Sequence, residues 1–386
     1  MLTVIYIIVF IGILLKLRTF IFKDVIYIPP GFEDCLSGNI SKKRATLHRL
    51  KQQREIGSIP PHYPNGWFAL LESQELKRGT IVDIHALGLH LVAWRADNTG
   101  SAQVSNADCS CGANLAKDGS IVEDVIVCSS HGHDFNLEQS ICGLKSEQRS
   151  RSDTEMFTIL ERNGFLYLWY HAEGLEPHYY PEEFEEILTG RWKCRARARN
   201  ELYAHIQDIR ENEADVNHFA YTHKDGFALG LKSNMTEWSI WRIFDFTNFE
   251  FEGHWTPGEN KHQSVLILDV YLCLFGRKIC KCSTFRNTAT GLGIFILNWS
   301  NILVDMKLLI CYTPVGPMKL QGIKRLYCSP WIPSLFVSYI MTLIEANSCK
   351  DARVWNRKTH IRSPCLTAED SCIKGFRTWC LQFYSM

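Results

Sequence analysis

Short apolar runs separated by turn residues fill the chain between Gly66 and Tyr170. Runs of this length that are rich in aromatic and β-branched residues and bounded by turn signals are typical of β-strands. The pattern therefore predicts a small all-β domain over residues 63–175. The clearest of these runs are Trp67–Leu71, Gly88–Trp94, Ile121–Cys128 and Phe165–Trp169.

A different pattern begins after a Pro- and Glu-rich stretch, Glu176–Glu186. Residues 187–386 combine β-like runs, such as Trp238–Phe251 and Ser264–Phe275, with one long helical pattern over Pro333–Lys358. Such a combination indicates an antiparallel sheet that wraps around a helix. We expect a second domain here, and an α+β fold for the chain.

The first residues of the chain, 1–22, have the composition of a transmembrane anchor. Met1–Leu15 is apolar and uncharged. A span needs about 20 residues, which is reached if Lys16 and Arg18 extend toward the lipid headgroups. Basic residues after the apolar run favour a cytoplasmic body. We expect a single-pass membrane protein, of the endoplasmic reticulum for example, with a cleaved signal peptide as the alternative.

Residues 23–62 are predicted to be a linker. This segment is polar and basic, and it is interrupted by the proline pairs Pro29-Pro30 and Pro60-Pro61. Proline breaks regular structure, so only one short helix is expected, around Lys42–Glu55.

Composition narrows the class of protein. The chain has 386 residues, of which 46% are hydrophobic and 22% are charged, as in globular proteins with more than one core. Its net charge of +1 argues against binding of nucleic acid. The 15 cysteines are odd in number and irregular in spacing, so a fully paired disulfide framework is not expected.

Two cysteine-containing motifs lie within the predicted all-β domain. The first is Cys109-Ser-Cys111-Gly, and the second is Cys128-Ser-Ser-His131-Gly. Each places two potential metal ligands on one tight loop, which a surrounding sheet can hold rigid. Thiolate and imidazole pairs of this kind indicate a Rieske [2Fe–2S] centre, in which two Cys bind one iron and two His bind the other.

The first motif departs from the Rieske pattern, which is Cys-x-His followed by Cys-x-x-His. Cys111 stands where a histidine belongs, and one residue is missing before Gly112. Three outcomes are open: the three cysteines and one histidine bind a cluster of lowered potential, the same four groups bind Zn²⁺, or no metal binds. His133 is a further candidate ligand, although a solvent-facing loop histidine is its plainer interpretation.

The segment Glu211–His223 carries a second set of candidate metal ligands. On a helix, Asp215 and His218 share a face, whereas His223 must come from the next turn or from the exit loop. Two histidines so placed fit two corners of the facial triad by which oxygenases bind ferrous iron, with two His and one carboxylate.

The carboxylate of such a triad must come from elsewhere in the chain. Asp351, on the predicted long helix, is the best candidate, and Glu345, Glu211 and Glu213 are rivals. Taken alone, a helix with two histidines and an aspartate is more often a hydrated face. A Rieske-like loop pair about 90 residues upstream reverses that preference.

The chain resembles the Neverland-type cholesterol 7-desaturases of the Rieske oxygenase superfamily. The resemblance covers almost the whole chain, from the anchor to the C-terminus. The matching stretches are Tyr63–Phe68, Gly112–Leu115, Ala204–Asp208, Glu211–His223, Tyr312–Val315, Tyr327–Trp331, Asp351–Lys358 and Gln382–Ser385.

The resemblance implies an N-terminal Rieske domain and a C-terminal helix-grip catalytic domain. It implies that His218, His223 and Asp351 bind Fe(II), and that Asp215 connects the cluster of one subunit to the iron of its neighbour in a homotrimer. It further implies that O₂ and electrons from NAD(P)H, delivered by a reductase, convert cholesterol to 7-dehydrocholesterol in steroid hormone biosynthesis. Because the chain has no Gly-rich dinucleotide fingerprint, that reductase is expected to be a separate protein.

The departures from the family pattern concentrate around the two metal sites. His133 stands where the family usually has tryptophan, Arg210 and Glu213 stand where it has proline and glycine, and Ser348–Lys350 replaces the usual glutamate-arginine pair before the ligand aspartate. Two hypotheses follow. The chain is either an active sterol desaturase, or a diverged non-catalytic sterol-binding paralogue with a defective or zinc-substituted cluster site. Apolar runs such as Ser264–Phe275 are compatible with a hydrophobic ligand pocket and equally with ordinary core packing.

Overall fold

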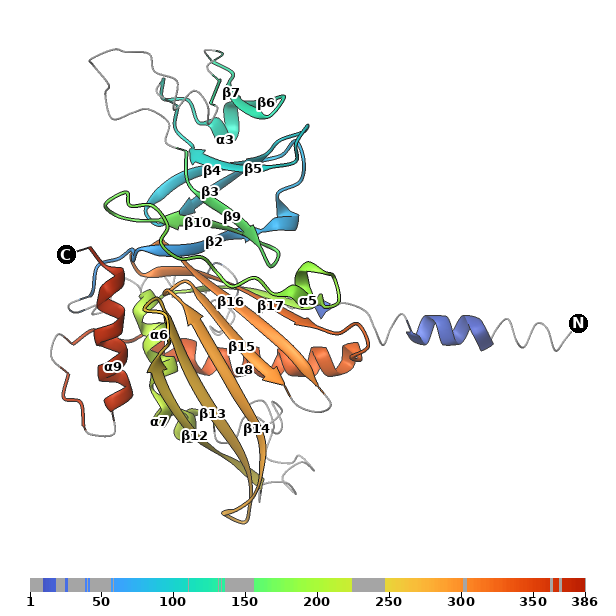
Figure 1. Ribbon diagram of the computed structural model, residues 1–386, viewed down its shortest axis with the longest axis vertical. Coiled ribbons are helices and arrows are strands. Elements are labelled where there is room, and N and C mark those ends of the chain that lie inside the picture. Colours follow the sequence, from blue (N-terminus) through green and yellow to red (C-terminus); the bar gives the residue numbers. More distant parts are fainter. Residues whose placement is uncertain are drawn as a thin grey trace, which may run out of the picture.

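In a computed structural model, the two predicted regions, residues 63–175 and 187–386, form separate β-sheets (Figure 1). The structure describes residues 10–18, 25–26, 39, 41, 57, 59–109, 111–130, 132, 134–135, 156–223, 247–300, 304–361, 364–367 and 370–385. The predicted short helix Lys42–Glu55, the ligand candidates His131 and His133, and most of the predicted run Trp238–Phe251 lie outside these residues.

The described residues of the first part form three antiparallel sheets with three strands each, in the upper half of Figure 1. The predicted run Ile121–Cys128 is two strands rather than one, because Glu123 adopts a positive φ of 58° and turns the chain. The sheets are β2 (Gly66–Glu72), β10 (Phe165–Tyr170) and β9 (Ile159–Arg162); β3 (Ile81–Ala86), β4 (Leu89–Arg95) and β5 (Ala102–Asn106); and β6 (Gly119–Val122), β7 (Val125–Cys128) and β8 (Asp134–Phe135). Short helical turns are η2 (Ser73–Glu75), α3 (Leu115–Asp118) and α5 (Glu185–Leu188).

The second part is one eight-stranded sheet in the order β1-β11-β17-β16-β15-β14-β13-β12, antiparallel except for the β1–β11 pair. The predicted run Ser264–Phe275 forms one of its strands, β13. The strands are β1 (Val25–Ile26), β11 (Lys193–Leu202), β12 (Thr247–Pro257), β13 (Gln263–Leu274), β14 (Arg277–Thr290), β15 (Ile294–Ser300), β16 (Asp305–Gly316) and β17 (Lys319–Cys328).

Helices cover the large sheet. The long helix α8 (Ser334–Trp355) runs behind it in Figure 1, within the predicted range Pro333–Lys358. The C-terminal helix α9 (Ser371–Cys380) packs against β12 and is followed by η5 (Leu381–Phe383). Two shorter helices, α6 (Ile206–Ala214) and α7 (Val216–Thr222), lie between β11 and β12 in the chain. The antiparallel sheet and long helix expected from the sequence are thus both present.

The two parts share one hydrophobic core, which contains Leu91 of β4 as well as Leu308 of β16 and Met341 of α8. Hydrogen bonds cross the same boundary: the backbone N–H of Leu87 donates to Pro314 O at 2.6 Å. The Rieske-like part is therefore packed firmly against the large sheet.

The transmembrane anchor predicted for residues 1–22 is not supported. The described part of this segment, residues 10–18, is helical. No helix within the described residues is both long and apolar enough to cross a membrane.

Candidate functional site

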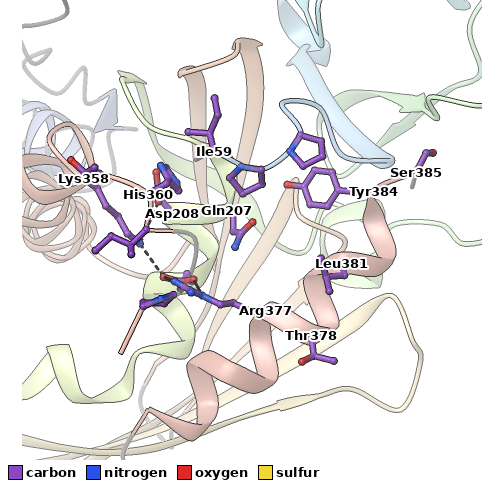
Figure 2. A pocket seen from close by; sticks show the side chains of 16 residues that line it. Ile59, Gln207, Asp208, Lys358, His360, Arg377, Thr378, Leu381, Tyr384 and Ser385 are labelled. Carbon is purple, nitrogen blue, oxygen red and sulfur yellow. Dashed lines mark hydrogen bonds and ion pairs between the residues drawn. The ribbon is translucent and has the colours of Figure 1, made fainter. Parts of the chain in front are cut away.

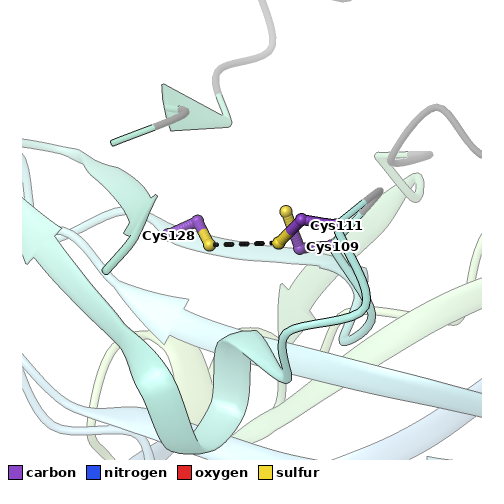
Figure 3. Close-up of side chains that lie close together, drawn as sticks. All are labelled: Cys109, Cys111 and Cys128. Atoms are coloured by element: carbon purple, nitrogen blue, oxygen red, sulfur yellow. Dashed lines mark hydrogen bonds between the residues drawn. The ribbon is translucent and has the colours of Figure 1, made fainter. Parts of the chain in front are cut away.

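Two tight loops at the end of the small domain bring three sulfur atoms together (Figure 3). The backbone N–H of Gly112 donates to Cys109 O, and that of Cys109 donates to Ala113 O, both at 2.8 Å. Gly112 has a φ of 83°, which glycine adopts without steric cost. Cys128 ends β7 on the opposite side of the site. The sheet thus holds both cysteine loops, as the motif spacing predicted.

The side chain of Cys111 points toward the other two cysteines. Its Sγ lies 3.7 Å from Sγ of Cys128, and all three sulfurs, including that of Cys109, lie within 4.8 Å of one another. Two thiolates bound to one tetrahedral metal at about 2.3 Å are about 3.8 Å apart. The thiol set therefore fits metal binding, either as part of an iron–sulfur cluster or around Zn²⁺, and Cys111 belongs to it.

Burial affects the chemistry of these thiols. Cys109 is 4% exposed and Cys128 is fully buried, whereas Cys111 is exposed. Burial raises the pKa of the Cys109 thiol, partly offset by a backbone hydrogen bond involving Cys111. A thiolate here is consequently favoured only when a positive metal compensates its charge.

The segment with the two histidines is broken at Asp215. This residue ends α6 and caps α7, because its carboxylate accepts the backbone N–H of His218 at 3.2 Å. The break changes the direction of the chain at the start of α7. His218 within this helix and His223, its C-cap residue, therefore lie close together. The sequence predicted a helical segment with both histidines, but not the cap that separates the two helices.

The predicted triad is assembled in space. The ligand atoms of His218, His223 and Asp351 all lie within 4.8 Å of one another. Nε2 of His223 is 3.2 Å from Oδ1 of Asp351, although the two residues are far apart in sequence. The two imidazole rings meet edge to face, with centroids 5.2 Å apart.

Hydrogen bonds orient both imidazoles. Nδ1 of His218 contacts the backbone carbonyl of Asp215, and Nδ1 of His223 lies 3.2 Å from Oδ1 of Asn347. With Nδ1–H donating in each ring, both Nε2 atoms carry a lone pair. Nε2 of His223 faces Asp351, whereas Nε2 of His218 lies 3.2 Å from the side-chain amide nitrogen of Asn212, which a metal ion would displace. Nε2 of His223 and Oδ1 of Asp351 are then two acceptors 3.2 Å apart, an arrangement that a proton or a metal cation must bridge. The donor set therefore fits a divalent cation.

Burial also favours the metal-binding form of His218. It lowers the pKa of this imidazole, opposed in part by the backbone carbonyl of Asp215 and the carboxylate of Asp351. A neutral imidazole is the form that binds metals. Sequence analysis missed Asn347, which lies one helical turn before Asp351 on α8; this spacing is the signal that could have found it.

The rival carboxylates have other partners. Glu345 accepts from Nζ of Lys324 at 2.6 Å, with both side chains 1% exposed. Glu213 pairs with the buried Arg210, and Glu211 accepts from Nε of Arg377 at 2.6 Å. These cations leave Asp351 as the carboxylate at the triad.

An apolar cavity of about 160 Å³ adjoins the triad. The predicted apolar runs supply part of its wall, as does Glu213, whose pKa is raised to about 7 because burial outweighs the pull of Arg210. The apolar lining includes Leu266, Leu268, Phe285, Phe295, Leu297 and Ile310.

A larger cavity of about 740 Å³ lies on the other side of α6, and its wall combines apolar side chains such as Ile361 and Leu381 with a cluster of charged ones (Figure 2). Asp208 Oδ1 is 2.8 Å from Nε2 of His360 and 3.3 Å from Nζ of Lys358. Glu211 binds both Lys358 and Arg377. These charges neutralise one another, and the ion pair of Glu211 with Arg377 connects α6 to α9. The charged cluster therefore stabilises the position of α6 and does not take part in the triad.

Comparison with known proteins shows to which family the chain belongs. A model of the Rieske [2Fe-2S] domain matches residues 66–154, and one of the 3-ketosteroid 9alpha-hydroxylase C-terminal domain matches residues 168–384. Cholesterol 7-desaturase nvd of Xenopus laevis is 32% identical over 348 residues, which cover 88% of this chain and 76% of that protein. The chain belongs to the cholesterol 7-desaturase family of Rieske oxygenases.

Other members of the cholesterol 7-desaturase family agree. Cholesterol 7-desaturase nvd of Drosophila melanogaster is 31% identical over 358 residues, covering 89% of this chain and 80% of that protein. Among solved structures, dicamba monooxygenase bound to dicamba superposes with a TM-score of 0.57 at 11% identity, covering 83% of this chain and 97% of that one. That likeness shows the Rieske oxygenase fold.

Proposed function

We propose that this protein is a Rieske-type sterol desaturase, which converts cholesterol to 7-dehydrocholesterol with O₂ and electrons from NAD(P)H. The observation that carries the proposal is the convergence of His218, His223 and Asp351 beside an apolar cavity. The names of the relatives, cholesterol 7-desaturases, support the choice of substrate.

In this proposal His218, His223 and Asp351 hold Fe(II). The bound iron would supply the activation of O₂ that hydrogen removal from an unactivated carbon requires. The residues of the chain itself position the metal ligands and the substrate. Asn347 and the carbonyl of Asp215 fix the tautomer of the two imidazoles, and the cavity wall excludes water around the reacting carbons.

Electrons would enter through a [2Fe–2S] cluster held by Cys109, Cys111, Cys128 and His131, and would come from a separate reductase. The cluster loops and the triad lie in different parts of the chain, with β7 at the top of Figure 1 and α7 near its lower end. We therefore propose a homotrimer in which Asp215 links the cluster of one subunit to the iron of the next. The hydrogen bond from the His218 amide to Asp215 provides the connection on the iron side.

Only the reacting part of the sterol ring system would lie inside the apolar cavity. A volume of about 160 Å³ is below the roughly 300–1,000 Å³ of sites that enclose a drug-sized ligand. The rest of a sterol must then extend beyond the walls that the described residues form. We also propose that residues 1–22 attach the protein to the membrane of the endoplasmic reticulum, with a cytoplasmic body. This attachment would place the protein where sterols partition.

The test is metal and product analysis on the purified full chain. We expect iron and acid-labile sulfide, the visible absorption and rhombic EPR signal of a two-iron cluster, and 7-dehydrocholesterol after incubation with cholesterol, O₂ and a reductase. His218→Ala should abolish turnover and leave the cluster signal. A colourless protein containing zinc or no metal would contradict the desaturase function and favour a sterol-binding paralogue.

A further inference from the structure

The hairpin of β3 and β4 carries two histidines and an aspartate on one exposed face. Leu87 and Gly88 form its turn with positive φ angles of 56° and 75°, which match the twist of a two-residue hairpin. The register pairs His85 directly with His90. Asp83 lies two residues before His85 and so on the same face of β3.

The three side chains converge. The imidazole rings of His85 and His90 stack with centroids 4.3 Å apart and an interplanar angle of 10°. Oδ1 of Asp83 is 2.8 Å from Nε2 of His90 and 4.0 Å from Nε2 of His85. All three ligand atoms lie within 4.8 Å of one another. An ion pair between Asp83 and His90 would account for one of these contacts, but not for the second imidazole.

A fourth group points to metal binding. Oδ1 of Asp108 lies 3.3 Å from Nδ1 of His90, on the side of the ring away from Asp83. A metal-binding histidine commonly donates its second ring N–H to a carboxylate, which fixes the tautomer and raises the basicity of the ligand nitrogen. Asp108 stands in that position, so Nε2 of His90 is presented toward Asp83 and His85.

We propose that Asp83, His85 and His90 form a second metal site, for Zn²⁺ or a similar late divalent transition metal. Two imidazole nitrogens and one carboxylate oxygen suit such an ion, with water in the remaining position. Ligand atoms around a tetrahedral ion are about 3.3 Å apart. In the observed stack the two ring planes are nearly parallel, so one ion cannot lie in both of them. Binding therefore requires the ring of His85, whose side chain is 66% exposed, to turn out of the stack until both Nε2 atoms face the ion.

The site is linked to the cluster loop. Asp108 directly precedes Cys109, and the backbone N–H of Ala107 donates to His90 O at 2.9 Å. A bound ion would therefore tie the hairpin to the loop that carries the first thiol. The site is independent of the triad at His218, so it can exist whether or not the chain is a desaturase.

Cobalt titration of the full chain tests the proposal, since Co²⁺ reports its ligands optically. Thiolate ligation produces intense charge-transfer absorption, whereas imidazole and carboxylate ligation produces only weak d–d bands. We expect the His85→Ala/His90→Ala double variant to lose one equivalent of Co²⁺ of the weak-band type and to keep the thiolate bands. His171→Ala, which removes another histidine of the same part of the chain, should bind as the wild type does.

A second variant examines the orienting carboxylate. Asp108→Asn should weaken Zn²⁺ binding at this site by about 10- to 100-fold, as for other partners of metal-binding histidines. Far-UV circular dichroism checks that each variant is folded. Equal stoichiometry in the wild type and the double variant would overturn the site, and unchanged affinity in Asp108→Asn would overturn the role of Asp108.

Discussion

Cys111 is the residue on which the proposed electron entry depends. Its sulfur lies 3.7 Å from that of Cys128, so the replacement of histidine by cysteine keeps a metal-binding group at this position. A thiolate adds negative charge where a Rieske centre has a neutral imidazole, and this stabilises the oxidised cluster.

We predict that Cys111→His raises the reduction potential of the cluster toward the Rieske range of about −150 to +300 mV. Protein-film voltammetry or a redox titration followed by EPR measures the shift. Cys282→Ser, at an exposed cysteine of β14, is the matched control and should leave the potential unchanged. If Cys111→His also left it unchanged, Cys111 would not be a cluster ligand.

His205 shows how a single buried imidazole sets the pH dependence of stability. It caps α6: Nδ1 accepts the backbone N–H of Gln207 at 3.2 Å, and Nε2 lies 3.0 Å from Pro61 O. This pattern requires the neutral ring. Burial lowers the pKa of His205 to about 4, opposed mainly by its backbone hydrogen bond to Pro61.

Because the unfolded chain has a histidine pKa of about 6.5, it binds more protons than the folded chain between pH 6.5 and about 4. The stability contributed by neutral His205 is complete above that window and is lost as the pH falls through it, by roughly 3 kcal/mol. Urea denaturation at several pH values should show a smaller loss for His205→Asn, which can still cap the helix. Equal losses in both proteins would contradict the prediction.

At the scale of elements, α8 is the support on which the triad depends. It carries Asp351 and Asn347 on the face that meets α7, and it is fastened to β17 by Lys324, whose Nζ donates to Glu345 at 2.6 Å and to Ser348 Oγ at 2.8 Å. Both charges of the pair are 1% exposed. Removing one partner would leave the other charge buried without compensation.

Lys324→Met is predicted to destabilise the fold by about 3–5 kcal/mol, and adding Glu345→Leu should recover most of that loss. Chemical denaturation of the two single variants and the double variant gives the coupling energy. Lys319→Met removes an exposed partner of Glu201 and is the control, with little expected change. Additive losses in the double variant would show that the pair is not coupled.

At the scale of the whole molecule, the two proposed redox sites lie in parts that share a core, but β7 beside one site and α7 beside the other are far apart in space (Figure 1). A subunit that transfers electrons only within itself would have to bridge that separation. Transfer between neighbours in a ring avoids it, and this is the reason to propose a trimer.

Mixed assemblies would distinguish these routes. Cys128→Ser removes a cluster ligand and His218→Ala removes an iron ligand, so each variant alone should be inactive. Co-expression should restore about one quarter of the wild-type rate, since in a random ring one interface in four joins an intact cluster to an intact triad. No recovery, with trimers verified by analytical ultracentrifugation, would place electron transfer within one subunit.

The sequence by itself determined the features that depend on neighbouring residues. Apolar runs located strands such as β2, β10 and β13, and helical periodicity located α8. The spacing of Cys109, Cys111 and Cys128 and that of His218 and His223 indicated metal sites, because ligands on one loop or one helix keep a short, regular separation.

Only the tertiary structure decided what depends on residues far apart in the chain. It separated Asp351 from its rivals, because Lys324, Arg210 and Arg377 bring their positive charges to the other three carboxylates. It broke the histidine segment at Asp215 through a cap that no periodicity encodes. Long-range contacts are set by how strands pair and helices pack, so His223 could meet Asp351 and Asn347 only once α8 had packed beside the end of α7.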